Sequence, residues 1–431
     1  MRKKINVCFL ILIPLLVIGI NANIVPFWVA FAALIIRLIF ADKHSVGVFL
    51  LLFGGILGST IRFEIPSLPI YGLLLNLFGL FLIMDVFGRP KKSFTSSLQM
   101  LIITLVYFLF TYVFSPNIGD IRATDKIITL ILNGFMSFFA YFAFIHSPKI
   151  DNEVLAQSLF LVTILFFIHN MKILGVSPNG FFDYEWQRNG ATALFRELDE
   201  EKYVKFVNYQ VVGMNALFGL TMYLSQLNYN TKKAILYCLV TLQLVLSSGA
   251  RQAIFGFFII LILSRTIFNN RDLSKINISK VLRYVICGSI CVYAIVHILP
   301  LLGVDYLTDT LSEGDKGREM LRTMGWELFF RYPLFGAGLG GFNHVYPGML
   351  YPHNFIIEVL CECGIIGAVF LLFVLIVHWR HQKLRVLYLT NSRSFIFLIL
   401  TAEGISIMVS GDLSNSISLF SAVFACGHLL R

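Results

Sequence analysis

Apolar residues along the chain come in runs of about 20, separated by short polar or charged connections. Folded as a helix, a run of this length crosses the roughly 30 Å of hydrocarbon in a bilayer. The pattern predicts about fourteen such helices, or about twelve if the shortest runs do not cross. Their ranges are 6–22, 24–41, 46–62, 68–87, 97–115, 127–146, 154–175, 207–226, 233–249, 252–268, 279–302, 354–378, 393–410 and 413–430. We therefore expect an all-α, polytopic transmembrane bundle that forms one integral membrane domain over residues 1–431.

Composition supports the membrane class. Hydrophobic residues make up 57% of the chain and charged residues 13%, against about a quarter charged in soluble domains. The net charge of +10 is scattered between apolar runs, so it does not indicate nucleic-acid binding. The seven cysteines include no CxxC pair and are expected to pack as small apolar residues. Met1 to Lys4 precede an apolar run without a small-residue cleavage site, which predicts an uncleaved first helix.

The positive charges predict the orientation of the bundle. If the N-terminus is cytoplasmic, alternate short connections should carry Lys and Arg. They do, at Arg37, Lys43, Arg89, Lys91, Lys92, Lys149, Lys232, Lys233, Arg265, Arg271, Lys275, Lys280, Arg283, Arg380, Lys383, Arg385 and Arg393. Both termini are therefore expected in the cytoplasm.

Two long connections then fall outside, at about 176–206 and about 303–353. The second, larger one is expected to be partly helical and contains Arg318, Arg322 and Arg331, while the first contains Arg188. Long external loops are largely exempt from the charge rule. The cations either pair with acids of the same loop or form a basic site for a polyanion such as phosphate, which Arg binds in a bidentate manner.

Arg251 is the first candidate for that chemistry. It follows Ser247-Ser248-Gly249-Ala250 between two apolar runs, at their predicted outer end. Small residues there allow close helix approach. An arginine at this depth is costly unless it is paired or hydrated, so it indicates function, with snorkelling to the interface as the alternative.

The second candidate segment begins at Gly317 and ends in the glycine-rich run 336–341. Arg318, Arg322 and Trp326 follow a spacing of three to four, which predicts an amphipathic helix along the membrane surface that ends before Pro333. No strand precedes the glycine run, so we interpret it as a tight turn with close backbone approach and not as a dinucleotide site.

The third candidate segment is Tyr351-Pro352-His353-Asn354 at the outer end of a predicted helix. A neutral imidazole there can act as a base or donate to phosphate, although a single interfacial histidine can also be purely structural. Glu358 lies one turn deeper.

These three segments, in this order, resemble the family of O-antigen ligases and O-antigen polymerases of bacterial surface-polysaccharide assembly. That family has an Arg at the outer end of a middle helix, matched by Arg251 in the segment 251–255, where the ligase motif ends in Leu and this chain has Phe255. It also has an Arg fifteen residues before a Pro and a glycine-rich turn, as Arg318 precedes Pro333. Arg322 is the neighbouring alternative.

The most specific element of the resemblance is His-Asn, nine residues, Gly, two residues, Gly, which His353, Asn354, Gly364 and Gly367 match in full. The detailed resemblance covers roughly residues 210–378. The predicted topology independently places all three motifs on the outer face.

The resemblance implies a membrane glycosyltransferase that uses a glycan on undecaprenyl pyrophosphate at the periplasmic face of the bacterial inner membrane. Arg251 and Arg318 are expected to bind the pyrophosphate, and His353 to activate the acceptor. Arg322, Arg188, Asn354 and Asp412 are the predicted auxiliary contacts. We expect no cofactor and no metal ion, since the outer loops contain no Asp-x-Asp pair and the arginines supply the positive charge.

We favour a polymerase that joins repeat units over a ligase that transfers the finished chain to the lipid A core. A flippase for the same lipid-linked oligosaccharide is the alternative from a different class, but it would need charged residues near the bilayer midplane. A non-catalytic membrane scaffold is a further alternative. Besides the lipid-linked glycan and the bilayer, pathway analogy suggests a chain-length regulator as a partner.

Overall fold

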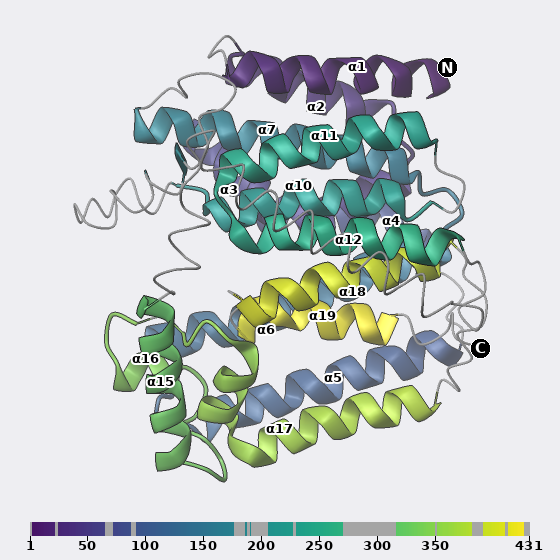
Figure 1. Cartoon of the computed structure of the whole chain (residues 1–431). Helices are drawn as coiled ribbons and strands as arrows, with labels where there is room; N and C mark the ends of the chain where they lie inside the picture. Colours follow the sequence, from purple (N-terminus) through teal and green to yellow (C-terminus); the bar gives the residue numbers. More distant parts are fainter. Residues whose placement is uncertain are drawn as a thin grey trace. The chain divides into compact units, whose positions relative to one another are not determined.

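The computed structural model describes residues 2–21, 25–64, 72–87, 92–175, 186–187, 190, 206–226, 230–269, 316–349, 351–381, 391–409 and 413–425. Its regular elements are helices, and no strand occurs within these ranges, so the predicted all-α class is confirmed (Figure 1). The helices are α1 Arg2–Asn21, α2 Phe27–Ile39, α3 Lys43–Glu64, α4 Gly72–Phe87, α5 Lys92–Val113, α6 Ile121–His146, α7 Asn152–Leu174, α10 Tyr209–Leu224, α11 Thr231–Ser248, α12 Arg251–Asn269, α15 Lys316–Arg331, α16 Gly341–Val345, α17 Phe355–His381, α18 Asn391–Val409 and α19 Leu413–Ala425.

Thirteen of the fourteen predicted helices coincide with one of these elements, and the fourteenth, 279–302, lies outside the described residues. Five described helices are long and apolar enough to cross a bilayer: α3, α5, α6, α7 and α17. Shorter apolar stretches lie in α1, α2, α4, α18 and α19. The chain is thus a multi-pass membrane protein, and the total of 12–14 spans stays a prediction.

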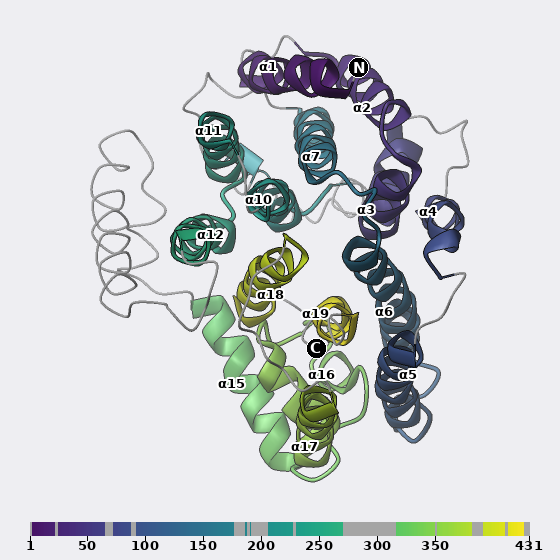
Figure 2. The ribbon, with the colours of Figure 1, turned by 90° about the vertical axis from the view of Figure 1, so that its right-hand side faces the viewer.

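The chain divides into two compact units, which are described separately. The first comprises residues 1–85, 147–308 and 387–402. Its central helix is α7, which contacts α1, α2, α3 and α10, as the view along the helices shows (Figure 2). Because α7 is apolar on all sides and nearly all of it is buried, its neighbours surround it completely.

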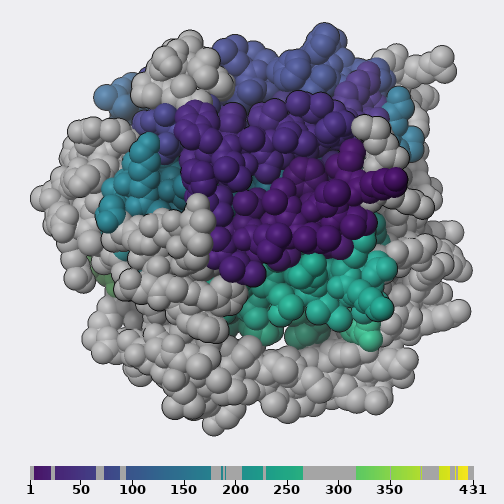
Figure 3. All heavy atoms as spheres, turned by 90° about the horizontal axis from the view of Figure 1, so that it is seen from above, coloured from purple at the N-terminus to yellow at the C-terminus, as the bar shows by residue number. Residues whose placement is uncertain are grey.

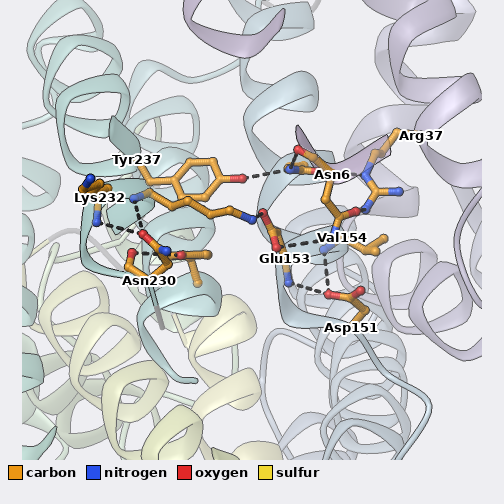
Figure 4. Close-up of polar contacts among 11 residues, drawn as sticks. Asn6, Arg37, Asp151, Glu153, Val154, Asn230, Lys232 and Tyr237 are labelled. Atoms are coloured by element: carbon orange, nitrogen blue, oxygen red, sulfur yellow. Dashed lines mark hydrogen bonds and ion pairs between the residues drawn. The ribbon is translucent and has the colours of Figure 1, made fainter. Parts of the chain in front are cut away.

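A buried polar network joins α1, α2, α7 and α11 within the first unit (Figure 4). Arg37 Nε donates to Gln157 Oε1 (2.7 Å), and Arg37 Nη2 donates to Asn6 Oδ1 (2.8 Å). Gln157 Nε2 donates in turn to the hydroxyl of Tyr237 (2.9 Å). Arg37, one of the charges that predict the orientation, is only 1% exposed. Neutral amide oxygens accept hydrogen bonds from its guanidinium inside the bundle.

The outer side of α1 carries an apolar stripe. Val7, Ile11, Leu15 and Ile18 are each about half exposed and recur every three to four residues. Figure 3 looks onto this face, with α1 (dark purple) beside α11 (teal). A continuous exposed stripe of this kind is suited to lipid chains and not to water.

The second unit comprises residues 86–146, 309–386 and 403–431. Here α19 packs along α6, and Ser421 Oγ donates to the carbonyl of Gly134 across that interface (2.9 Å). α17 packs on α5 through the stacked rings of Tyr107 and Phe370, whose centroids are 4.3 Å apart. This unit contains two of the three segments that the sequence singled out.

Candidate active site

Arg251 opens α12 in the first unit, directly after a tight turn. Gly249 ends α11 in the left-handed conformation (φ 70°), and Ser248 Oγ accepts the N–H of Ala250 (3.2 Å). A Cβ on Gly213 of α10 would lie 2.6 Å from the Cβ of Ala250. The predicted close approach of small residues is therefore confirmed. It holds the half-buried Arg251 at the N-terminal end of its helix.

In the second unit, α15 confirms the predicted helix, while its position along the membrane surface stays a prediction. It ends at Arg331, two residues before Pro333, and runs across α17 and not along it, as both ribbon views show (Figures 1 and 2). Leu328 is fully buried, whereas Trp326 and Phe330 are exposed. A helix that crosses the spanning helices of its own unit has the orientation expected for the membrane surface.

Both candidate arginines of α15 share the face that packs on α17. Gly325 marks this face, because a Cβ there would lie 2.5 Å from Ile357 and 3.1 Å from Pro352. Arg322 precedes Gly325 by three residues and Arg318 by seven, so both lie on the same side of the helix. Pro352 is followed at once by His353. The structure thus brings the arginine-bearing face of α15 to the start of α17, where His353 lies.

The glycine-rich segment 333–341 is inserted into a break in α17. Gly364, inside that helix, combines a positive φ with an extended ψ (φ 67°, ψ −173°). Essentially only glycine adopts this conformation, and it interrupts the helical hydrogen bonds. The carbonyls before the break accept hydrogen bonds from the segment, and the amides after the break donate to it. Ala337 N–H donates to the Cys361 carbonyl (2.8 Å), Gly338 N–H to the Glu362 carbonyl (3.0 Å), Ile365 N–H to Pro333 (2.9 Å) and Ile366 N–H to Leu334 (3.2 Å).

This insertion explains the spacing of the glycine motifs. A Cβ on Gly364 would lie 2.2 Å from the Leu334 carbonyl oxygen, and one on Gly336 would lie 2.3 Å from the Glu362 carbonyl carbon. A Cβ on Gly367 would lie 2.5 Å from the hydroxyl oxygen of Tyr107. Only glycine permits backbones to approach this closely. The predicted tight turn is therefore confirmed, and its partner is α17.

His353 and Asn354 form the entry to α17. His353 has a left-handed backbone (φ 53°), and its ring lies 4.4 Å from that of Tyr351. Asn354 Oδ1 accepts the N–H of Ile357 (3.2 Å), as an N-cap does. A non-glycine residue in this conformation costs about 1–2 kcal/mol, so the surrounding contacts hold the imidazole in place against that strain.

Beneath this entry lies an ion cluster that the sequence analysis did not assign. Lys126 of α6 pairs with Glu358 and Glu362 of α17, and both carboxylates are fully buried. The signal was present: two acids four residues apart in an otherwise apolar helix indicate a specific partner. Sequence spacing predicts that Glu358 lies close to His353 but does not identify its partner on α6.

The remaining candidates divide as follows. Arg188 and Asp412 lie outside the described residues. Arg251 belongs to the first unit, and Arg318, Arg322, His353 and Asn354 belong to the second. The structure therefore brings together the candidates of α15 and α17, while the inclusion of Arg251, Arg188 and Asp412 in the same site stays a prediction from the sequence.

Comparison with known proteins supports the motif assignment. Residues 236–372 match the family described as O-antigen ligase, a stretch that includes Arg251, Arg318, His353 and Gly367. The resemblance to the O-antigen ligase and polymerase family is confirmed over this stretch. No curated protein matches the sequence.

Proposed function

We propose, from the match of residues 236–372 to the O-antigen ligase family, that this multi-pass membrane protein polymerises O-antigen or related polysaccharide repeat units. The donor is a glycan on undecaprenyl pyrophosphate, used at the periplasmic face of the inner membrane. The observation that supports this most directly is the geometry around α17. There the His-Asn-to-Gly motif and the glycine-rich turn form one hydrogen-bonded assembly beside the arginine-bearing face of α15.

The proposed reaction joins an acceptor hydroxyl to the anomeric carbon of the donor sugar. The new bond forms between that oxygen and that carbon, and the bond from the carbon to the phosphate oxygen breaks. Undecaprenyl pyrophosphate departs with the electron pair, and the hydroxyl proton passes to the imidazole of His353. Negative charge therefore grows on the pyrophosphate as the reaction proceeds.

Arginines suit that charge because their planar guanidinium groups donate two parallel hydrogen bonds to phosphate. We assign Arg251 and Arg318 to the pyrophosphate, with Arg322 and Arg188 as auxiliaries and no metal ion. Loss of one preorganised donor of this kind typically lowers the rate about 100-fold to 1000-fold. Asn354 caps the helix that presents His353, and Asp412 is proposed to orient one of these groups.

Arg251→Lys tests the pyrophosphate role, because it keeps the charge and removes the bidentate fork. We expect polysaccharide yield or chain length to fall sharply in a deletion strain that carries this variant, measured on gels of the surface polysaccharide. Arg265→Lys, on the same helix α12 but in its last turns, is the matched control. It should restore the full series of polysaccharide bands on the gel. Full activity of the Arg251→Lys variant would remove the pyrophosphate role from Arg251.

An O-antigen ligase is the second candidate, since the matched family bears that description. The deletion strain separates the two: a core capped by one repeat unit indicates a polymerase, and a bare core indicates a ligase. Transport of the lipid-linked oligosaccharide by purified protein in liposomes, without change to the glycan, would instead indicate a flippase.

A further inference from the structure

The ion cluster below His353 contains one cation and two anions in a buried setting. Lys126 Nζ lies 2.7 Å from Glu362 Oε2 and also pairs with Glu358. Both carboxylates are 0% exposed, and the lysine side chain is 12% exposed. Among the residues that the structure describes, the cluster therefore contains two carboxylates and one ammonium group, packed between apolar helices.

Two backbone amides also donate hydrogen bonds to the carboxylates of the cluster. Glu358 Oε2 accepts the N–H of Leu413 (2.8 Å), and Glu362 Oε2 accepts the N–H of Gly340 (3.1 Å). The cluster thus joins four parts of the second unit at one point: α6, α17, the first residue of α19 and the end of the glycine-rich segment.

Stability alone does not account for such a cluster. Removing three charged groups from water is costly, and apolar residues of similar volume often give an equally stable protein. Ionisable groups within membrane helices are expensive and are mostly retained for function. Unlike apolar packing, the cluster forms directional bonds between particular atoms.

Two of the links end at or beside a residue of the candidate site. The N–H of Glu358 donates to the carbonyl of Asn354 (3.0 Å), so the first turn of α17 connects the cluster to His353. Leu413 follows Asp412 directly in the chain. Gly340 is the last residue but one of the glycine-rich segment 333–341, which begins just after α15. The cluster therefore fixes the histidine and the start of α19 with respect to each other.

We propose that Lys126, Glu358 and Glu362 are positioning residues of the transferase site, which hold His353 and the segment after Asp412 in their reactive arrangement. This inference rests on the proposed function. None of the three needs to touch the substrate. The hydrogen bonds that join Glu358 to Leu413 and to Asn354 run to the acceptor-activating side of the site. We therefore expect their loss to slow the reaction and to leave donor binding nearly unchanged.

The test compares Lys126→Met and Glu358→Gln with the parent protein in detergent or liposomes. The substrate is undecaprenyl-pyrophosphate-linked repeat unit extracted from the deletion strain. We expect kcat to fall at least about 10-fold, while KM for the lipid-linked donor stays within about twofold. Lys233→Met and Glu153→Gln are the matched controls, because this 2.6 Å pair is also partly buried but lies in the first unit. They should leave both parameters unchanged per folded molecule.

Glu362→Gln is a second variant that keeps the test informative if Lys126→Met does not fold. It leaves one lysine facing one carboxylate, so it should fold even where Lys126→Met does not, and it should still lower kcat. An unchanged kcat in folded Glu358→Gln and Glu362→Gln variants, or a rise in KM alone, would overturn the positioning role. If the parent itself transfers no glycan, the proposed function fails. If the parent is active and Arg251→Lys is not, while the cluster variants equal the controls, only this inference fails.

Discussion

His353 is the residue at which the conflict between backbone preference and chemistry is most direct. Its left-handed φ of 53° disfavours any side chain with a Cβ, yet the residue is an imidazole at the entry to α17. Strain of this type at a single position commonly accompanies a functional requirement. The side chain, and not the backbone, is therefore the reason for histidine at this site.

His353→Gly separates the two contributions. Relief of left-handed strain, about 1 kcal/mol, offsets the extra freedom of glycine in the unfolded chain, about 0.5–1 kcal/mol. We expect the thermal unfolding midpoint in detergent to stay close to that of the parent, while glycan transfer is lost. Transfer at the parent rate by this variant would exclude His353 as the group that accepts the hydroxyl proton.

At the scale of elements, the break in α17 is held open by the inserted glycine-rich segment. Gly364→Ala adds a methyl group only 2.2 Å from the Leu334 carbonyl oxygen and at a positive φ. We expect a loss of at least about 2 kcal/mol in unfolding free energy, because left-handed strain adds to the clash. Gly404→Ala, in α18 with no atom within 4 Å of the new Cβ, is the control and should be neutral or slightly stabilising. Equal stability of the two variants would mean that the glycine-rich segment does not pack closely against Gly364 of α17.

The buried network of the first unit makes a second prediction at this scale. Gln157→Leu removes both the acceptor of Arg37 Nε and the donor to Tyr237. Loss of a hydrogen bond to a buried guanidinium lowers the free energy of unfolding by about 1.5–3 kcal/mol. The Tyr237 hydroxyl, which loses its Gln157 donor, adds to this loss. Thermal unfolding should therefore occur several degrees lower than in the parent. An unchanged midpoint would show that the network contributes no net stability.

At the scale of the whole molecule, the charge pattern predicts which ends and loops face the cytoplasm. Alkaline phosphatase inserted at Gly348, in the turn after α16, should be active because that turn is expected in the periplasm. Green fluorescent protein fused after Arg431 should fluoresce because the C-terminus is expected in the cytoplasm. An inactive phosphatase at Gly348 would contradict the predicted orientation and with it the periplasmic site.

Hydropathy alone determined the helical class and thirteen helix positions, because in a bilayer every backbone polar group must bond within its own helix. Local chemistry also predicted the end of α15 before Pro333 and the close packing around Gly249. The motif resemblance identified the residues 318, 353, 364 and 367 before their contacts were known. These features depend on neighbours in the chain, so the sequence carries them directly.

Only the tertiary structure decided which distant residues meet. The partner of Glu358 and Glu362 is Lys126, more than 230 residues earlier. The glycine-rich turn pairs with the break at Gly364, and Arg37 is buried against Gln157. The physical reason is the same in each case. Buried charges and unpaired amides must find partners, but the fold selects them from many equivalent donors and acceptors that spacing cannot rank.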